Sequence, residues 1–150
     1  MTDSALASMK RLVVKVGSSS ISGPNVNQIE PLIDTLAAAR ARNINVVLVS
    51  SGAMATAYGP LGFAEKPSDL ASLQAAAAVG QSKLMWRYQN ALDRYDLLAG
   101  QILLTASDLE DPTARANARA AFDRLLELGV LPIVNENDAV ATDEIRFGDN

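Results

Sequence analysis

Apolar residues gather in four short runs along the chain, and each run predicts a buried strand. The runs are Leu12–Gly17, Ile44–Ser50, Leu97–Thr105 and Val130–Asn135, and most of their residues are Val, Ile or Leu. Consecutive apolar positions without strict alternation are typical of strands in parallel sheets. We therefore expect a parallel sheet whose strands are covered on both faces.

Between these runs, apolar positions repeat with the period of amphipathic helices. One apolar stripe extends from Ile29 to Ala37, and another extends from Ala118 to Leu126, after which Gly129 predicts the helix end. The longest segment, Ser68–Tyr95, is interrupted by Gly80, which predicts close packing or a bend. Its apolar side comprises Leu70, Leu73, Ala77, Leu84, Tyr88 and Leu92. Strands that alternate with helices predict β-α-β units and an α/β fold.

Composition narrows the function classes. The 150 residues carry a net charge of −4 without a basic cluster, which argues against nucleic acid as a partner. No apolar run approaches the roughly 20 residues of a membrane span, and no signal peptide is evident, so we expect a cytoplasmic location and no membrane partner. The sequence has no Cys and no His, which removes thiol and imidazole chemistry. Phosphoryl transfer remains, because it depends mainly on positioning and charge neutralisation.

Polar or glycine-rich residues follow every predicted strand. These segments are Lys15–Ser20, Ser50–Ala53, Leu104–Asp111 and Asn135–Glu144. Ligands of open parallel α/β sheets bind at the carboxyl ends of the strands. The coincidence predicts a ligand site at this edge of the sheet.

Lys15 interrupts the first apolar strand two residues before its end. It can extend to solvent as an ordinary surface lysine, or it can carry its ammonium past Gly17 to an anion. Gly17 permits close backbone approach, and the amides of Ser18–Ser20 can face phosphate oxygens. The sequence has neither a P-loop nor a dinucleotide-binding motif.

Two further segments allow a structural and a ligand-binding interpretation. After the second strand, Ser51 can cap a helix while Gly52 relieves crowding, and a ligand carboxylate can use the same free amides. The segment Asn135–Glu144 can be a solvated loop, as is common where Asn and Asp crowd together, or part of a binding site.

Five segments together resemble the glutamate 5-kinases of the amino acid kinase family. They are "LVVKVGSSSI", "VVLVSSGAMATAYGPLG", "ASLQAAAAVGQSKL", "GQILLTASDLED" and "LPIVNENDAVATDEIRFGDN". The resemblance runs in order from about Leu12 to Asn150, and the last segment is the most specific. "VNENDAVAT" followed by "GDN" is similar to this branch rather than to acetylglutamate, carbamate, aspartate or uridylate kinases.

The resemblance implies ATP- and Mg²⁺-dependent phosphorylation of the side-chain carboxylate of L-glutamate, at the entry to proline synthesis. It implies a three-layer α/β/α sandwich with a largely parallel sheet, of which this chain holds the amino-terminal, substrate-binding half. The nucleotide-binding half would be missing, so we expect residues 1–150 alone to be inactive. Many members of the family assemble as homo-oligomers and are inhibited by proline, and only the resemblance implies these properties here.

The resemblance also implies roles for single residues. Lys15 corresponds to a catalytic lysine that contacts the transferring phosphoryl group, and Gly17 and Ser18 accompany it at the ATP site. The residues placed around glutamate are Ser51, Gly52, Asn135, Asp138, Asp149 and Asn150. A lone carboxylate repels an acidic amino acid unless it faces the ammonium group, so Asp138 is expected there. No residue is assigned to a metal.

Two other functions stay open at this point. One is a related kinase with another acidic substrate, which the identity of the product would distinguish. The other is a non-catalytic half-domain that binds glutamate or proline without chemistry. The sequence that follows Asn150 in the gene would distinguish the latter.

Overall fold

The computed structural model describes residues 10–140. Its strands are β1 (Arg11–Val16), β2 (Asn45–Ser50), β3 (Ala99–Leu104) and β4 (Leu131–Glu136). Its helices are η1 (Ser18–Ser20), η2 (Gly23–Gln28), α2 (Ile29–Ala41), α3 (Ala53–Tyr58), α4 (Leu70–Asp93), α5 (Ala106–Glu110) and α6 (Pro112–Glu127). All four predicted strands and all three predicted helical segments are present, and the alternation of strands and helices confirms the α/β class.

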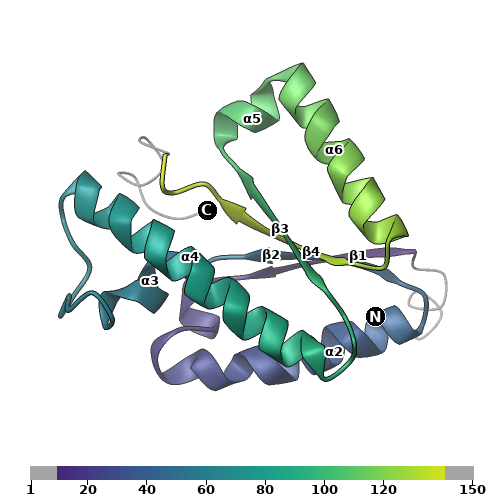
Figure 1. Ribbon diagram of the computed structural model, residues 1–150, viewed down its shortest axis with the longest axis horizontal. Coiled ribbons are helices and arrows are strands. Elements are labelled where there is room, and N and C mark those ends of the chain that lie inside the picture. Colours follow the sequence, from purple (N-terminus) through teal and green to yellow (C-terminus); the bar gives the residue numbers. More distant parts are fainter. Residues whose placement is uncertain (1–9, 141–150) are drawn as a thin grey trace.

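The strands of residues 10–140 form one parallel sheet in the order β1-β2-β4-β3. Lys15 is in register with Val49 of β2, and Leu103 of β3 with Asn135 of β4. Because every pair is parallel, all carboxyl ends lie at one edge, on the left of Figure 1. This arrangement gathers the polar segments that follow the strands.

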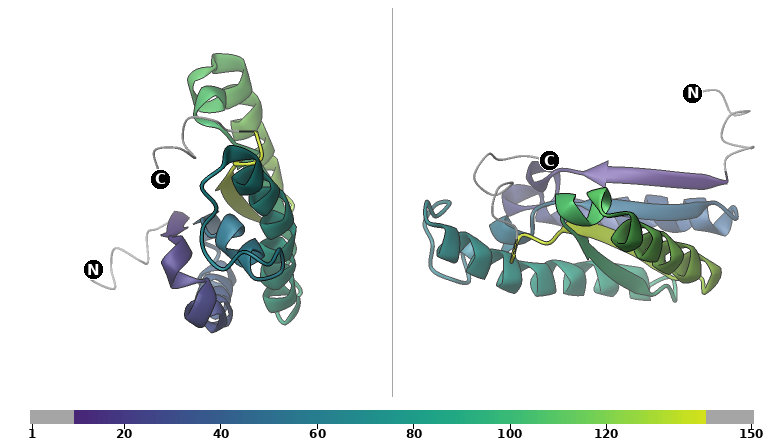
Figure 2. Two further views of the ribbon diagram at one scale, coloured as in Figure 1. Left: turned by 90° about the vertical axis from the view of Figure 1, so that its left-hand side faces the viewer. Right: turned by 90° about the horizontal axis from the view of Figure 1, so that it is seen from above.

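Helices lie on both sides of the sheet. Helices α2, α3 and α4 lie on one side, and α6 lies on the other (Figures 1 and 2). Leu36 of α2, Leu84 of α4 and Leu48 of β2 belong to the core cluster between the sheet and the first layer. On the opposite side, a Cβ on Gly100 of β3 would lie 3.0 Å from Leu125 of α6. A glycine therefore lets α6 approach the sheet closely.

The expectation that every strand is covered on both faces is wrong for β1. This strand lies at the edge of the sheet, and its residues alternate between half-buried and exposed. Leu12, Val14 and Val16 pack against the core, whereas Val13 is 59% exposed and Lys15 is exposed. The apolar run predicted a strand buried on both faces. Val13 is nevertheless exposed, because it lies on a face of β1 that α6 does not cover.

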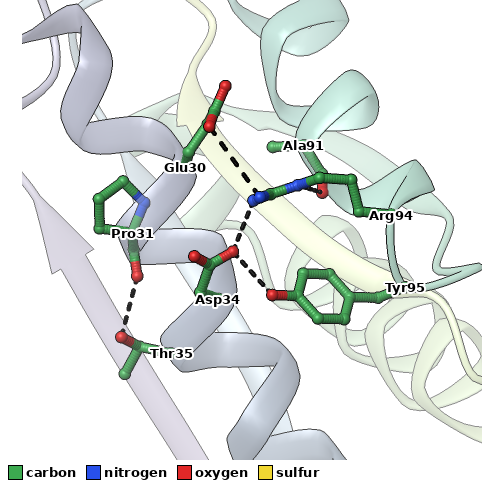
Figure 3. Close-up of polar contacts among 7 residues, drawn as sticks. All are labelled: Glu30, Pro31, Asp34, Thr35, Ala91, Arg94 and Tyr95. Atoms are coloured by element: carbon green, nitrogen blue, oxygen red, sulfur yellow. Dashed lines mark hydrogen bonds and ion pairs between the residues drawn. The ribbon is translucent and has the colours of Figure 1, made fainter.

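A polar cluster ties α2 to the residues that follow α4 (Figure 3). Arg94 forms an ion pair with Asp34, and the hydroxyl of Tyr95 donates to the same carboxylate at 2.7 Å. Glu30 is a more distant partner of Arg94, at 4.0 Å. These groups lie at the surface and are partnered with one another.

No helix within residues 10–140 has the length and apolar character needed to cross a membrane.

Candidate functional site at the carboxyl edge of the sheet

The loops after β1 and β2 are joined by backbone contacts. The amide of Ser51 donates to the carbonyl of Val16 at 3.0 Å, which ties the start of one loop to the end of the other strand. Gly52 has a φ of 94°, and a Cβ there would lie 3.2 Å from the Cα of Ser18. Gly52 therefore serves both a left-handed backbone conformation and a close approach. The predicted relief of crowding by Gly52 is confirmed.

The prediction that Ser51 caps the following helix is wrong. Helix α3 begins at Ala53, and its N-cap is Gly52, with no side-chain cap. The carbonyl of Gly52 instead accepts hydrogen bonds from the amide and the hydroxyl of Thr56, at 3.1 and 2.9 Å. Ser51 is thus placed by its backbone, and its half-buried hydroxyl is not used to cap α3.

The neighbouring residue, Ser50, anchors this loop to α4. Its hydroxyl lies 2.7 Å from the hydroxyl of Tyr88, and both side chains are buried. Burial raises the pKa of Tyr88 to about 12, and the hydrogen bond with Ser50 opposes part of that rise. The phenol therefore stays neutral at physiological pH and holds the end of β2 as a hydrogen-bonding partner.

Helix α3 crosses α4 at Gly80 without room for a side chain. A Cβ on Gly80 would lie 1.7 Å from the carbonyl oxygen of Ala53, a separation that real atoms do not tolerate. Helix α4 is continuous through Gly80, so close packing, and not a bend, explains the glycine. The contact fixes the start of α3 against the middle of α4, next to Gln81.

The end of β4 is held by a buried amide pair. Asn135 is 5% exposed and Gln81 is 9% exposed, and the Nδ2 of Asn135 donates to the Oε1 of Gln81 at 2.8 Å. The Oδ1 of Asn135 accepts from the amide of Glu136 at 2.9 Å. The amide of Asn137 donates to Leu104 at 2.9 Å, which joins the ends of β4 and β3. Asn135 is therefore a positioning residue within the fold rather than an exposed loop side chain.

A hollow of about 210 Å³ lies where β3, β4, α3 and α4 meet. Its lining residues are Ala53, Ala77, Ala78, Gln81, Ser82, Gln101, Leu103, Glu136, Asn137, Asp138 and Ala139. Drug-sized ligands occupy clefts of roughly 300–1,000 Å³, so this hollow suits a smaller molecule. Alanines on the helices give it room, and polar side chains from β3, β4 and α4 give it its chemistry.

Asp138 lies in the wall of this hollow, and its predicted contact with the substrate stays a prediction. Its side chain is half-buried. Its negative charge has an electrostatic effect on the phenol of Tyr58, the last residue of α3. The pKa of Tyr58 is raised, first by burial and then by the negative charge of Asp138. The two charges would repel if the phenol ionised, so Asp138 adds negative potential on the α3 side of the site.

Lys15, Gly17 and Ser18 do not line the hollow. They lie at the end of β1, and β2 separates that strand from β4. Lys15 is exposed on the face of β1 opposite to the core, and Gly17 has open space where a Cβ would stand. Ser51 and Gly52 lie between the two parts, at the end of β2. Of the predicted site residues that the structure describes, Asp138 lines the hollow, whereas Lys15, Gly17 and Ser18 form a separate region at the end of β1.

The exposed ammonium of Lys15 at the end of β1 is a group that can pair with a phosphate. Lys15 offers an ammonium, and the first amides of η1 have no partner inside that turn, as at every helix start. Residues 10–140 contain no group of three or more acidic side chains that could hold a metal ion. Asp149 and Asn150, two of the predicted glutamate ligands, lie outside the described residues.

The sequence interpretation missed Gln81, although a signal was present. Gln81 lies four residues after Ala77 and three before Leu84, within the apolar stripe of α4. A polar residue at a core position of an amphipathic helix needs a buried partner. Asn135, singled out at the end of β4, is that partner.

Comparison with known proteins agrees with this architecture. The model of the amino acid kinase family matches residues 10–150. The chain is similar to the glutamate 5-kinase of Leifsonia xyli subsp. xyli, with 63% identity over 145 residues, 97% of this chain and 54% of the relative. It is also 63% identical to that of Clavibacter sepedonicus over 145 residues, 97% of this chain and 56% of the relative.

A more distant glutamate 5-kinase, from Streptomyces coelicolor, is 49% identical over 150 residues, 97% of this chain and 40% of the relative. The chain spans about half the length of the curated relatives first compared. Because the family match extends over nearly all 150 residues, the conclusion about family is direct. The chain belongs to the amino acid kinase family.

Proposed function

We propose that this chain forms the amino-acid-binding part of a glutamate 5-kinase, which transfers the γ-phosphoryl group of ATP to the side-chain carboxylate of L-glutamate. The observation that carries the proposal is the 63% identity to glutamate 5-kinases over 97% of the chain. The hollow at the carboxyl edge supports it independently, because its size suits a small metabolite.

In this proposal, the α-carbon end of glutamate occupies the hollow and its side chain extends past the end of β2. Asp138 faces the α-ammonium group, since a carboxylate in the wall would repel either acidic group of the substrate. Ser51 and Gly52, at the end of β2, lie between the hollow and Lys15. The side-chain carboxylate would therefore reach the region where Lys15 and Ser18 receive the phosphates.

The reaction suits a chain without histidine. The side-chain carboxylate is already ionised near pH 7, so it attacks phosphorus without a general base. One oxygen–phosphorus bond forms, and the bond between the γ-phosphorus and the bridging oxygen breaks, with its electron pair leaving on ADP. What remains for the protein is alignment and charge neutralisation, and we assign part of the latter to the ammonium of Lys15.

We place most of the nucleotide site, and Mg²⁺ bound with ATP, outside this chain. The described residues hold no group of three or more acidic side chains that could bind a metal ion, and the chain spans about half the length of its relatives. The 150 residues alone are then expected not to turn over. Asp149 and Asn150 remain proposed glutamate ligands on the strength of the sequence resemblance.

The test uses the complete protein that contains this chain, with ATP, Mg²⁺, L-glutamate and hydroxylamine, which traps an acyl phosphate as a hydroxamate. The proposal expects hydroxamate with L-glutamate and far less with L-aspartate or N-acetyl-L-glutamate. Preference for either analogue would assign the chain to another kinase of the family. Binding of glutamate without any hydroxamate would support a non-catalytic module.

The remaining expectations are proposals about the complete enzyme. We propose that it works in the cytoplasm, assembles as a homo-oligomer and is inhibited by proline, as the resemblance implies. Proline added to the hydroxamate assay should lower the rate, and sedimentation should give a mass above that of one chain. A monomer that is insensitive to proline would remove both proposals and leave the reaction itself intact.

A further inference from the structure

Gln81 is a buried polar side chain whose contacts account for only half of its hydrogen-bonding groups. It is 9% exposed, lies next to the tight crossing at Gly80 and lines the hollow. Its Oε1 accepts a hydrogen bond from Asn135. Its Nε2 makes no hydrogen bond to the part of the chain that the structure describes. A carboxamide nitrogen carries two donors, so a buried glutamine of this kind is incomplete without another partner.

The orientation of Gln81 follows from the backbone. The amide of Glu136 can only donate, so the Asn135 atom that faces it at 2.9 Å must be the carbonyl oxygen. The other arm of Asn135 is then its NH₂ group, which donates to Gln81 at 2.8 Å. Gln81 must therefore present its oxygen to Asn135 and turn its own NH₂ group away. A backbone group thus fixes the direction of both side-chain amides.

Gln81 borders the hollow, and its NH₂ group is not fully enclosed by protein. Among residues 10–140, every fully buried side-chain nitrogen or oxygen has a hydrogen-bond partner. Because Nε2 has none, it is not fully enclosed, and the hollow is the space that Gln81 lines. The site therefore contains a donor held in place by Asn135 and left for a ligand.

The charge of the wall indicates what that donor binds. Among its described lining residues the hollow has two carboxylates, Glu136 and Asp138, and no lysine or arginine. An acidic ligand group can enter such a site only where neutral donors face it. Gln81 is a buried donor with a fixed direction on the α4 side of the hollow.

We propose that the NH₂ group of Gln81 donates to the α-carboxylate of the bound amino acid, and that Gln81 thereby selects substrates with a free α-carboxylate. The inference rests on the proposed function, which places the α-carbon end beside Asp138 in the same hollow. The ammonium and the carboxylate of an amino acid share one carbon, so the carboxylate lies near Asp138 without facing it. Beside the α-carboxylate, Gln81 provides a hydrogen-bond donor, whereas Asp138 provides only a negative charge.

The test is Gln81→Glu, which keeps an oxygen for Asn135 and replaces the donor with a negative oxygen. Its ligands are L-glutamate and L-isoglutamine, whose α-carboxylate is a carboxamide while its side-chain carboxylate is retained. Calorimetry on the complete protein should show about 10- to 100-fold weaker binding of glutamate, as for a lost hydrogen bond to a charged group. Isoglutamine, which can donate to the new carboxylate, should change by less than about threefold.

Gln101→Glu is the matched control, because it adds the same charge to the same hollow without a hydrogen bond to Asn135. It should lower the preference for glutamate over isoglutamine clearly less than Gln81→Glu does, because its charge acts only through space. An unchanged preference in folded Gln81→Glu, or an equal loss in Gln101→Glu, would overturn the assignment. Should Gln81→Glu not fold, Gln81→Met removes both the donor and the acceptor for Asn135 without adding charge, and it should lose the preference in the same direction.

Calorimetry also separates this inference from the proposed function. A wild-type protein that binds glutamate selectively through Gln81 but yields no hydroxamate would retain the inference and lose the kinase. A protein that forms hydroxamate, with a preference independent of residue 81, would retain the kinase and lose the inference. Absence of glutamate binding in the wild-type protein would overturn both.

Discussion

Two polar clusters join α4 to its surroundings, and they are built in opposite ways. Arg94, Tyr95 and Asp34 lie at the surface near the end of α4, with the ion-paired side chains of Arg94 and Asp34 44% and 47% exposed (Figure 3). Gln81 and Asn135 lie in the interior, at the carboxyl edge of the sheet. The surface cluster combines charges that partner one another, whereas the interior pair is neutral and leaves the NH₂ group of Gln81 without a partner among the described residues.

The difference separates structural polarity from functional polarity. Exposed ion pairs stabilise folds by only about 0–1 kcal/mol, and they cost little because water still solvates both charges. A buried amide loses its water and must be compensated by hydrogen bonds. An interior donor without a protein partner is therefore tolerated where a ligand completes it. The cluster with the stronger charges is accordingly the less informative about function.

The largest effect is expected from Gly80→Ala, which attacks the packing beneath the interior pair. The new Cβ would lie 1.7 Å from the carbonyl oxygen of Ala53, so α3 and α4 must separate. We expect the free energy of unfolding to fall by more than the about 1–3 kcal/mol typical of overpacked cores, measured by urea denaturation. Gly59→Ala is the control, because a Cβ there meets nothing within 4 Å. Equal free energies of unfolding for the two variants would show that α3 and α4 leave room for a methyl group at Gly80.

Lys15→Met tests the cationic strand end in the complete enzyme. Loss of one group aimed at the transferring phosphoryl should lower kcat by about 10²–10³-fold and change the KM for glutamate far less. Lys10→Met, which removes the same charge just before β1, should leave kcat nearly unchanged. If Lys15→Met retains wild-type kcat in the hydroxamate assay, Lys15 is an ordinary surface lysine that does not contribute to phosphoryl transfer.

Asp138→Ala tests the acidic wall of the hollow. Removing one partner of a shielded charge pair costs about 2–5 kcal/mol, so the KM for glutamate should rise by roughly 30-fold or more. The KM for ATP, titrated at saturating glutamate, should hardly change. Ser51→Ala loses only a neutral hydroxyl, worth about 0.5–1.5 kcal/mol, and should weaken glutamate less. If the KM for ATP rises and the KM for glutamate does not change, Asp138 contributes to nucleotide binding and not to glutamate binding.

The sequence predicted the fold well because burial and periodicity are local signals. Apolar runs indicated the strands, and polar strand ends indicated the edge where Asp138 and Ser51 lie. The interpretation of Val13 was wrong because the sequence does not show which strand forms an edge. Of the two interpretations of Ser51, capping of α3 is wrong, because the amide of Ser51 pairs with Val16 and the left-handed Gly52 is the N-cap.

Roles that depend on distant contacts were harder to predict. Gln81 and Asn135 are 54 residues apart, and only the fold brings them together. Gln81 stands out in the apolar stripe of α4, so its burial was predictable, but its partner was not. Gly80 likewise allows close packing or a bend in the sequence, and only its contact with Ala53 of α3 distinguishes the two.

The smallest effect is expected from Asp34→Asn in the surface cluster, and it completes the comparison with the interior pair. The variant loses the charge that pairs with Arg94, and for such an exposed pair the free energy of unfolding should fall by less than about 1 kcal/mol. The hydrogen bond to Asp34 is the main reason why the pKa of the Tyr95 phenol is raised, so that pKa should fall in the variant. Phenolate absorbance during an alkaline titration measures the change.

Glu30→Gln is the matched control for this variant, because it removes a charge from the same helix at the more distant contact with Arg94. It should move the pKa of Tyr95 less than Asp34→Asn does, since Glu30 makes no hydrogen bond to the phenol. Binding of glutamate should be unaffected by either variant, because neither residue lines the hollow. A loss of stability above about 2 kcal/mol in Asp34→Asn would make the surface cluster a main support of α2 and α4. The surface cluster would then contribute substantially to the free energy of unfolding, and the contrast with the interior pair would no longer hold.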